Sequence, residues 1–121
     1  MIVDSKTLNL KLLSQFPELG DAYNDLTVWQ EGDDTGSHVV FGDLLVPLIC
    51  DLIRNQQYAL AKRYFDFIEN LLEENDDYTT NVVAVSVIEA IVLDDVDQMK
   101  VEPLLGNKTL AIWNEFTEYY K

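Results

Sequence analysis

The sequence is short of the residues on which metal sites, disulfides and many catalytic centres depend. Among its 121 residues it has one cysteine, Cys50, and one histidine, His38. Structural zinc sites need several Cys and His side chains together, so the sequence predicts no such metal centre. Because Cys50 has no second cysteine to pair with and lies in an apolar segment, we expect a buried, reduced thiol and a reducing compartment.

Positive charge is also scarce. There are 8 Lys and Arg residues against 22 Asp and Glu residues, which gives a formal net charge of −14. The imbalance is greatest between Tyr64 and Met99, where ten carboxylates occur without a single Lys or Arg. A chain of this charge is repelled by nucleic-acid backbones and by anionic membrane surfaces, so we expect neither as a partner. A basic protein is the class of macromolecular partner that remains.

Long apolar runs are missing as well. The longest apolar stretch lies within residues 82–93 and is too short to span a bilayer. The first residues, MIVDSKTLNLKLL, lack the basic region and apolar core of a signal peptide. We therefore expect a cytoplasmic protein. A chain of 121 residues buries about 65% of the surface it would expose when unfolded, enough for a single domain over residues 1–121 with one core.

No catalytic signature is visible. The two glycines of the loop at residues 31–38 (EGDDTGSH) flank acidic residues, which would repel a phosphate group. The acidic run at residues 94–97 lacks the glycine and the ligand spacing of a calcium loop. A nucleophilic serine, or Cys50, would need His38 and an orienting acid, and no local pattern brings them together. We predict a protein without catalytic activity, cofactor or metal; an enzyme built on the loop and His38 is the weakest alternative.

What the sequence does contain is apolar residues at three- and four-residue spacing, the pattern of amphipathic helices. The clearest helix runs from about Gln56 to Glu74. An acidic turn then leads to the valine-rich segment, residues 82–93, with Thr79 or Thr80 as a helix cap. Its β-branched residues would also suit a buried strand, but no second strand is present to pair with it, so we predict a helix. The first of these two helices carries an apolar stripe formed by Ala61, Tyr64, Phe65, Ile68, Leu71 and Leu72.

Four further helices are predicted around this antiparallel hairpin, at residues 5–16, 19–29, 43–55 and 108–120. Asp4 or Ser5 caps the first of them, and Pro47 falls in the first turn of the third, where a missing N–H is tolerated. Residues 31–37 predict an exposed loop, and a short helical turn is expected around Val96 and Met99. The fold class is therefore all-α, a single small domain of about five or six helices in antiparallel hairpins, compatible with a miniature helical-repeat protein.

Two features of the apolar segments bear on binding. Glu89 is the one charged residue of the valine-rich segment. It is either a buried anchor that bonds a neighbouring tyrosine, tryptophan or partner group, or the one solvent-facing position of the helix. In the last helix Trp113 and Phe116 are expected in the core with Tyr120 one turn later, whereas Tyr119 and Tyr120 are also candidates for exposed contact residues.

Residues 63–92 resemble a diffuse group of small acidic bacterial proteins of uncharacterised function. In these proteins an F-x-x-I/L-E-x-L-L helix, an acidic turn and an N-x-[VI]-x-V-x-[VIF]-[LI]-E helix follow one another. The resemblance implies an all-helical fold and, for some relatives, a role as an immunity protein that neutralises a toxin made by the same cell. In this chain the two patterns fall on Phe65, Ile68, Glu69, Leu71 and Leu72, and on Asn81, Val83, Val85, Val87, Ile88 and Glu89.

The leading functional hypothesis is a non-catalytic protein-binding module, an immunity protein that neutralises a cognate toxin through an acidic surface. Such a surface can occupy the site that a phosphate backbone would use on a basic toxin domain. The alternative is a structural or adaptor protein of unknown partner whose acidity serves only solubility. The candidate contact residues are the acids at the two ends of the valine-rich segment, Glu73, Glu74, Asp76, Asp77, Asp94, Asp95 and Asp97.

Overall fold

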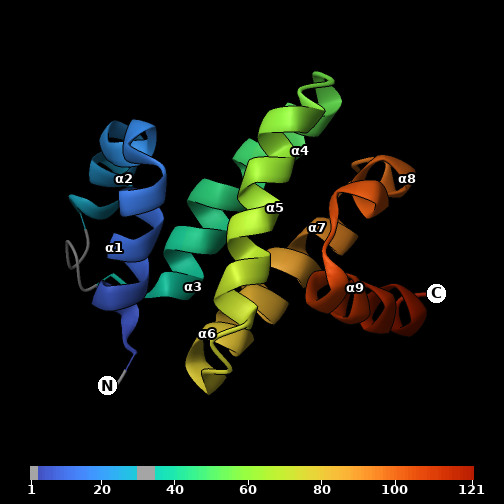
Figure 1. Ribbon diagram of the computed structural model, residues 1–121. Coiled ribbons are helices and arrows are strands. Elements are labelled where there is room, and N and C mark those ends of the chain that lie inside the picture. The colour runs from blue at the N-terminus through green and yellow to red at the C-terminus, as the bar shows by residue number, and fades with distance from the viewer. Residues whose placement is uncertain (1–2, 30–34) are drawn as a thin grey trace.

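The computed structural model describes residues 3–29 and 35–121, and this part of the chain is helical and contains no strand (Figure 1). The predicted all-α class is therefore confirmed. Segments labelled η are 3₁₀ or π turns that interrupt or extend the α-helices. In chain order the elements are α1 Ser5–Gln15, η1 Pro17–Leu19, α2 Gly20–Thr27, α3 Ser37–Val40, η3 Phe41–Leu45, α4 Val46–Arg54, α5 Tyr58–Leu72, α6 Asp77–Asn81, η4 Val82–Glu89, α7 Ala90–Leu93, α8 Gln98–Val101, η5 Glu102–Leu104 and α9 Asn107–Tyr119.

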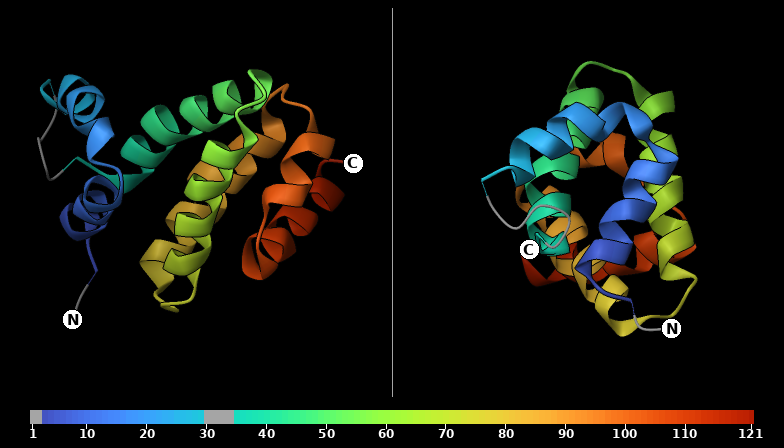
Figure 2. Two further views of the ribbon diagram at one scale, coloured as in Figure 1. Left: turned by 45° about the horizontal axis from the view of Figure 1, so that its top comes forward. Right: turned by 90° about the vertical axis from the view of Figure 1, so that its left-hand side faces the viewer.

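Three long helical rods form the centre of the molecule. The first is α3–η3–α4, the second is α5, and the third is the valine-rich helix, residues 77–93, made of α6, η4 and α7. The α5 rod and the valine-rich helix lie side by side as an antiparallel hairpin. The N-terminal helices α1 and α2 cover one flank of these rods, and α8 and α9 cover the opposite flank (Figures 1 and 2).

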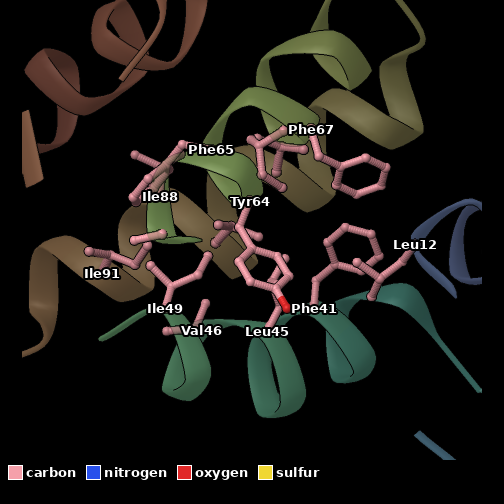
Figure 3. Packing of buried hydrophobic residues seen from close by; sticks show 14 of the residues in the cluster. Leu12, Phe41, Leu45, Val46, Ile49, Tyr64, Phe65, Phe67, Ile88 and Ile91 are labelled. Carbon is pink, nitrogen blue, oxygen red and sulfur yellow. The ribbon is translucent and has the colours of Figure 1, made fainter. Parts of the chain in front are cut away.

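The core is built where the three rods meet. All six residues of the apolar stripe predicted for α5 are buried. Figure 3 shows Phe41 and Leu45 from the first rod, Tyr64 and Phe65 from α5, and Ile88 from the valine-rich helix gathered in one cluster. A helix with apolar residues on several faces needs neighbours on several sides. The valine-rich helix has them in the first rod, in α9 and, at α6, in α5, which explains why its β-branched residues are stable in a helix.

Two π turns were not expected from the sequence. One is η3 in the first rod, and the other is η4 in the valine-rich helix; these two segments pack against each other. They approach closely at Gly42, where a Cβ atom would lie 3.6 Å from the backbone oxygen of Ser86. Each turn widens its helix and adds a residue to it, which redirects the side chains that follow.

The predicted start of the third helix at residue 43 is wrong, because the rod already begins at Ser37. Its regular α-helical part does restart at Val46, so Pro47 occupies the first turn of α4, as predicted. A proline in a helix lacks an N–H and its ring collides with the carbonyl four residues earlier. The π turn η3 ends at Leu45, two residues before Pro47, where a departure from regular α-helical hydrogen bonding is expected.

Three smaller expectations also need correction. The valine-rich helix is capped by Asp76, which accepts a 2.8 Å hydrogen bond from the Thr79 N–H, and not by Thr79 or Thr80. The second helix was predicted to extend to residue 29, but α2 ends at Thr27, and Trp29 is 91% exposed. Residues 31–34 of the predicted loop lie outside the described residues, whereas Thr35 and Ser37 are buried. The first cap is correct, since Asp4 accepts from the Thr7 N–H.

Cys50 is fully buried in α4, as predicted. Burial, with a further contribution from the charge of Asp94, raises the pKa of the Cys50 thiol to about 12. Because the thiolate is the reactive species, we expect native protein at pH 8 to react with a thiol reagent at least about 100-fold more slowly than protein in denaturant. Labelling followed by mass spectrometry measures both rates, and equal rates would contradict this packing.

Candidate partner-binding surfaces

The seven acidic residues predicted from the sequence fall into two separate groups. Residues 73–77 lie at the start of the valine-rich helix, whose first residue is Asp77, and residues 94–97 follow its end. At 1.5 Å per residue a helix of this length holds its ends roughly 25 Å apart. The two groups therefore form two surfaces and not one continuous patch.

In the first group, two of the four acids have structural partners. Asp76 caps the valine-rich helix, and Glu74 forms a 2.6 Å ion pair with Lys11 of α1. The hydrogen bond from the Thr79 N–H holds the pKa of Asp76 below its ordinary value. Glu73 and Asp77 are exposed and form no ion pair with any residue in the described part of the chain. These two are the acids available to a partner at this end.

In the second group every acid has a partner. Arg54, at the end of α4, pairs with both Asp94 and Asp95. The Val96 N–H donates to Asp94, and the Met99 N–H donates to Asp97, which caps α8. The Arg54 guanidinium, through its hydrogen bond, holds the pKa of Asp95 below its ordinary value. A stretch of sequence without Lys or Arg is therefore not a surface without cations, because Lys11 and Arg54 come from elsewhere in the chain.

The sequence motif contributes three polar side chains that join the hairpin to other elements. Glu69 of α5 accepts hydrogen bonds of 2.9 Å from the N–H groups of Lys108 and Thr109, at the start of α9. Asn81 faces the ring of His38, with 3.4 Å between Nδ2 and Nε2. Glu89 accepts a 2.6 Å hydrogen bond from the hydroxyl of Tyr120. The bond to a tyrosine in the first interpretation of Glu89 is confirmed, but Glu89 is half-buried and not the fully buried anchor of that interpretation.

A third surface, which the sequence pattern did not single out as acidic, surrounds Tyr120. In α9 Trp113 is buried and Phe116 is half-buried, but Tyr119 and Tyr120 remain 78% and 44% exposed, so Tyr120 does not follow Trp113 into the core. Two adjoining hollows share Tyr120, and together they are called the Tyr120 groove. One is lined by Glu89, Glu115, Phe116 and Tyr119, and the other by Val92, Leu93, Gln98, Thr117, Glu118 and Lys121.

The charges of the Tyr120 groove are unevenly balanced. Glu118 pairs with Lys121 at 3.2 Å. Glu89 and Glu115, on the other side of Tyr120, have no Lys or Arg partner among the residues that the structure describes. The hydrogen bond to Glu89 raises the pKa of Tyr120, which keeps its hydroxyl a donor. The Tyr119 and Tyr120 rings meet edge to face with their centroids 4.9 Å apart. This half of the groove is therefore both aromatic and negatively charged.

His38 contacts a serine that the sequence did not associate with it. Its Nδ1 atom lies 2.5 Å from the hydroxyl of Ser86, so α3 and η4 are joined by this contact. Cys50 is not part of the cluster, and no described carboxylate bonds the His38 ring. Ser86 is inside η4, where the backbone N–H groups bond within the helix and leave no oxyanion-binding pair. The contact joins α3 to η4 and contributes to the packing between them.

Within residues 3–29 and 35–121 there is no group of three or more His, Cys, Asp or Glu side chains that could hold a metal ion. Nor does any helix in these ranges have the length and apolar character needed to cross a bilayer.

These observations define a small acidic helical domain in which two helices of a central hairpin anchor an aromatic C-terminal helix. The chain belongs to the family described as Domain of unknown function (DUF7674), whose model matches residues 9–121. The matched range includes all of the motif and both groups of predicted contact acids. No curated protein and no solved structure matches the chain.

Proposed function

We propose that this chain is a non-catalytic protein-binding module that docks on a basic protein, and that it acts as an immunity protein for a toxin domain that attacks nucleic acid. The observation that carries the proposal is the formal net charge of −14, with exposed carboxylates on three surfaces and cations that neutralise only some of them. The motif on residues 65–89, with its resemblance to proteins of this kind, adds support.

The physical basis of the proposal is electrostatic complementarity. Opposed surface potentials steer two proteins together and raise their association rate, and they disfavour wrong partners. A protein that binds nucleic acid must present a basic surface to the phosphates. An acidic module can therefore cover that surface and compete with the substrate without any chemistry of its own.

A second candidate is favoured by a specific observation. Asp76 and Asp97 cap helices, and Asp94 bonds a backbone N–H and Arg54. These acids stabilise the fold whether or not a partner exists, as expected for an adaptor or structural protein whose charge serves solubility. The two proposals are distinguished by the exposed acids that have no such structural role.

The test begins with capture of a partner from native lysate, followed by its identification by mass spectrometry. The proposal requires a basic partner whose toxicity is suppressed when the two proteins are produced together. Its affinity must fall as the salt concentration rises from 0.05 to about 0.5 M, because screening shortens the range of charge interactions. A partner bound equally well across this range would refute the electrostatic mechanism.

A double variant, Glu73→Lys with Asp77→Asn, tests the surface at the start of the valine-rich helix. It changes the charge by three units and leaves the caps and ion pairs intact. We expect the partner affinity to fall about five-fold at low salt, because each exposed charge pair contributes up to about 1 kcal/mol. At high salt the affinity should approach that of the unmodified protein. Isothermal titration calorimetry measures the affinity at both salt concentrations.

The matched control is Asp25→Lys with Asp21→Asn on α2, which makes the same charge change. Asp21 occupies the first turn of α2 as Asp77 occupies that of α6, so the effects on the helix dipoles are similar. Equal losses in both double variants would show that total charge, and not this surface, governs binding. No loss in either would favour the adaptor.

A further inference from the structure

We propose that the half of the Tyr120 groove formed by Glu89, Glu115, Phe116, Tyr119 and Tyr120 binds one arginine side chain of a protein partner. The inference rests on the proposed function, because it supplies the basic partner with an anchor residue. It starts from the hollow itself, which has a volume of about 330 Å³ and is walled by two tyrosine rings and half-buried Phe116.

The carboxylates of this hollow lack the cation that usually accompanies them. Glu89 is partly buried and uses one oxygen, Oε2, to accept from the Tyr120 hydroxyl. The described residues provide no partner for its other oxygen, nor any for the carboxylate of Glu115. Lys121, the basic residue in the lining of the other half of the groove, is paired with Glu118. A cation from outside the chain would complete the charge balance.

The tyrosine rings select the kind of cation. Tyr119 is 78% exposed, and its ring meets the ring of Tyr120 edge to face. The hydroxyl of Tyr120 is in turn held by its hydrogen bond to Glu89. Rings held in this way offer a preorganised face for cation–π contact. A guanidinium group is flat, stacks on aromatic faces and bonds carboxylates with two N–H groups, whereas an ammonium group is a compact, strongly hydrated charge. The combination of rings and carboxylates therefore fits arginine better than lysine.

The surrounding surface also has the composition of a binding site. Tyrosine and methionine are enriched in protein interfaces, and arginine and tyrosine are frequent among the residues that dominate binding energy. Tyr119 and Tyr120 are exposed, as is Leu93 on the far side of the groove. Half-buried Phe116 joins them to the core. An anchor at this position would therefore have apolar and aromatic contacts beside its ionic ones.

The experiment is an NMR titration of the ¹⁵N-labelled protein with the peptide acetyl-Gly-Arg-Gly-amide. We expect saturable shifts of the backbone amides of Glu89, Glu115, Tyr119 and Tyr120 at millimolar peptide. The matched peptide with citrulline in place of arginine keeps the shape and loses the charge, so it should produce no saturable shift. The corresponding lysine peptide should bind at least two-fold more weakly than the arginine peptide.

Variants assign the contacts to their residues. Glu115→Gln and Tyr119→Leu should each weaken arginine binding about two- to five-fold, the range for one exposed cation–π or ion-pair contact. Glu18→Gln on η1, an exposed acid at the other end of the molecule, is the control and should leave binding unchanged. Circular dichroism of each variant verifies that the fold is retained.

Four outcomes would overturn the arginine site. They are the absence of shifts, shifts elsewhere on the surface, equal binding of the citrulline peptide, and shifts of the same amides with protein concentration alone, which would indicate a second copy of this chain. None of them bears on docking to a basic partner, which fails instead if the captured partner shows no salt dependence. The two proposals can therefore fail separately.

Discussion

Replacing Trp113 with alanine is expected to lower the free energy of unfolding by about 3–5 kcal/mol, the usual cost of removing a large buried aromatic side chain. Trp113 is 1% exposed and is among the largest fully buried side chains. It lies in α9, which packs on both α5 and η4, so its loss leaves a cavity where three elements meet. Urea denaturation monitored by circular dichroism measures the change in the midpoint and slope.

The second tryptophan supplies an internal control. Trp29 is 91% exposed, so Trp29→Ala should change the free energy of unfolding by less than about 0.5 kcal/mol. Because a loss of 3–5 kcal/mol can exceed the stability of a small domain, Trp113→Phe serves as a milder variant with an expected cost of about 1–2 kcal/mol. A similar cost for the two alanine variants would contradict the placement of α9 on the core.

The sequence was sufficient to predict those parts of the fold that depend on local periodicity. The stripe on α5 repeats at helical spacing, and burial of one face of a helix follows directly from it. The valine-rich helix was predicted by elimination, because a lone strand would leave its backbone groups unsatisfied. Both predictions required only residues close in the chain, and both agree with the structure.

What could not be predicted depends on contacts between distant residues. The first rod begins at Ser37 because Ser37 is buried and donates to Asn9, 28 residues away. The π turns occur where η3 meets η4, a packing relation that no periodicity encodes. The cations that pair with the predicted acids come from similar distances, since Lys11 and Glu74 are 63 residues apart. A charge pattern along the chain therefore overestimates the free negative charge on the surface.

The link between Glu69 and α9 is also distant, and it leads to the most specific stability prediction. The carboxylate of Glu69 accepts hydrogen bonds from the N–H groups of Lys108 and Thr109 and from the hydroxyl of Thr109, which is 40 residues along the chain. Gly106, at the N-cap position of α9, has no side chain to cap the helix, so Glu69 takes that role. Glu69→Ala should lower the free energy of unfolding by about 1–3 kcal/mol, the range for hydrogen bonds to a charged group and for loss of a helix cap.

Gly106→Ala should have nearly the same effect by a different route. A Cβ atom at Gly106 would lie 2.5 Å from Oε1 of Glu69, so the carboxylate must leave the helix end to make room. The backbone of Gly106, at φ −84°, suits alanine and adds no strain. Once Glu69 has been shortened to alanine the collision disappears, so the double variant should be little worse than either single one. A coupling energy near 1–2 kcal/mol is expected, and simple additivity would show that the two residues do not interact.

The same contact should make stability depend on pH in a predictable direction. Burial opposes ionisation of Glu69, but the N–H groups of Thr109 and Lys108 and the Thr109 hydroxyl outweigh it and hold the pKa of Glu69 below its ordinary value of 4.5. A carboxyl group whose pKa is lower in the folded state contributes stability that is complete above the unfolded pKa and is lost as the pH falls through the folded pKa. The cost of Glu69→Gln should therefore be full at pH 7 and shrink below about pH 4.5, as measured by urea denaturation across this range. Glu73 is an exposed acid just beyond the end of α5, so Glu73→Gln should show little cost at any pH. A pH-independent cost for Glu69→Gln would mean that the charge of the carboxylate does not stabilise the start of α9.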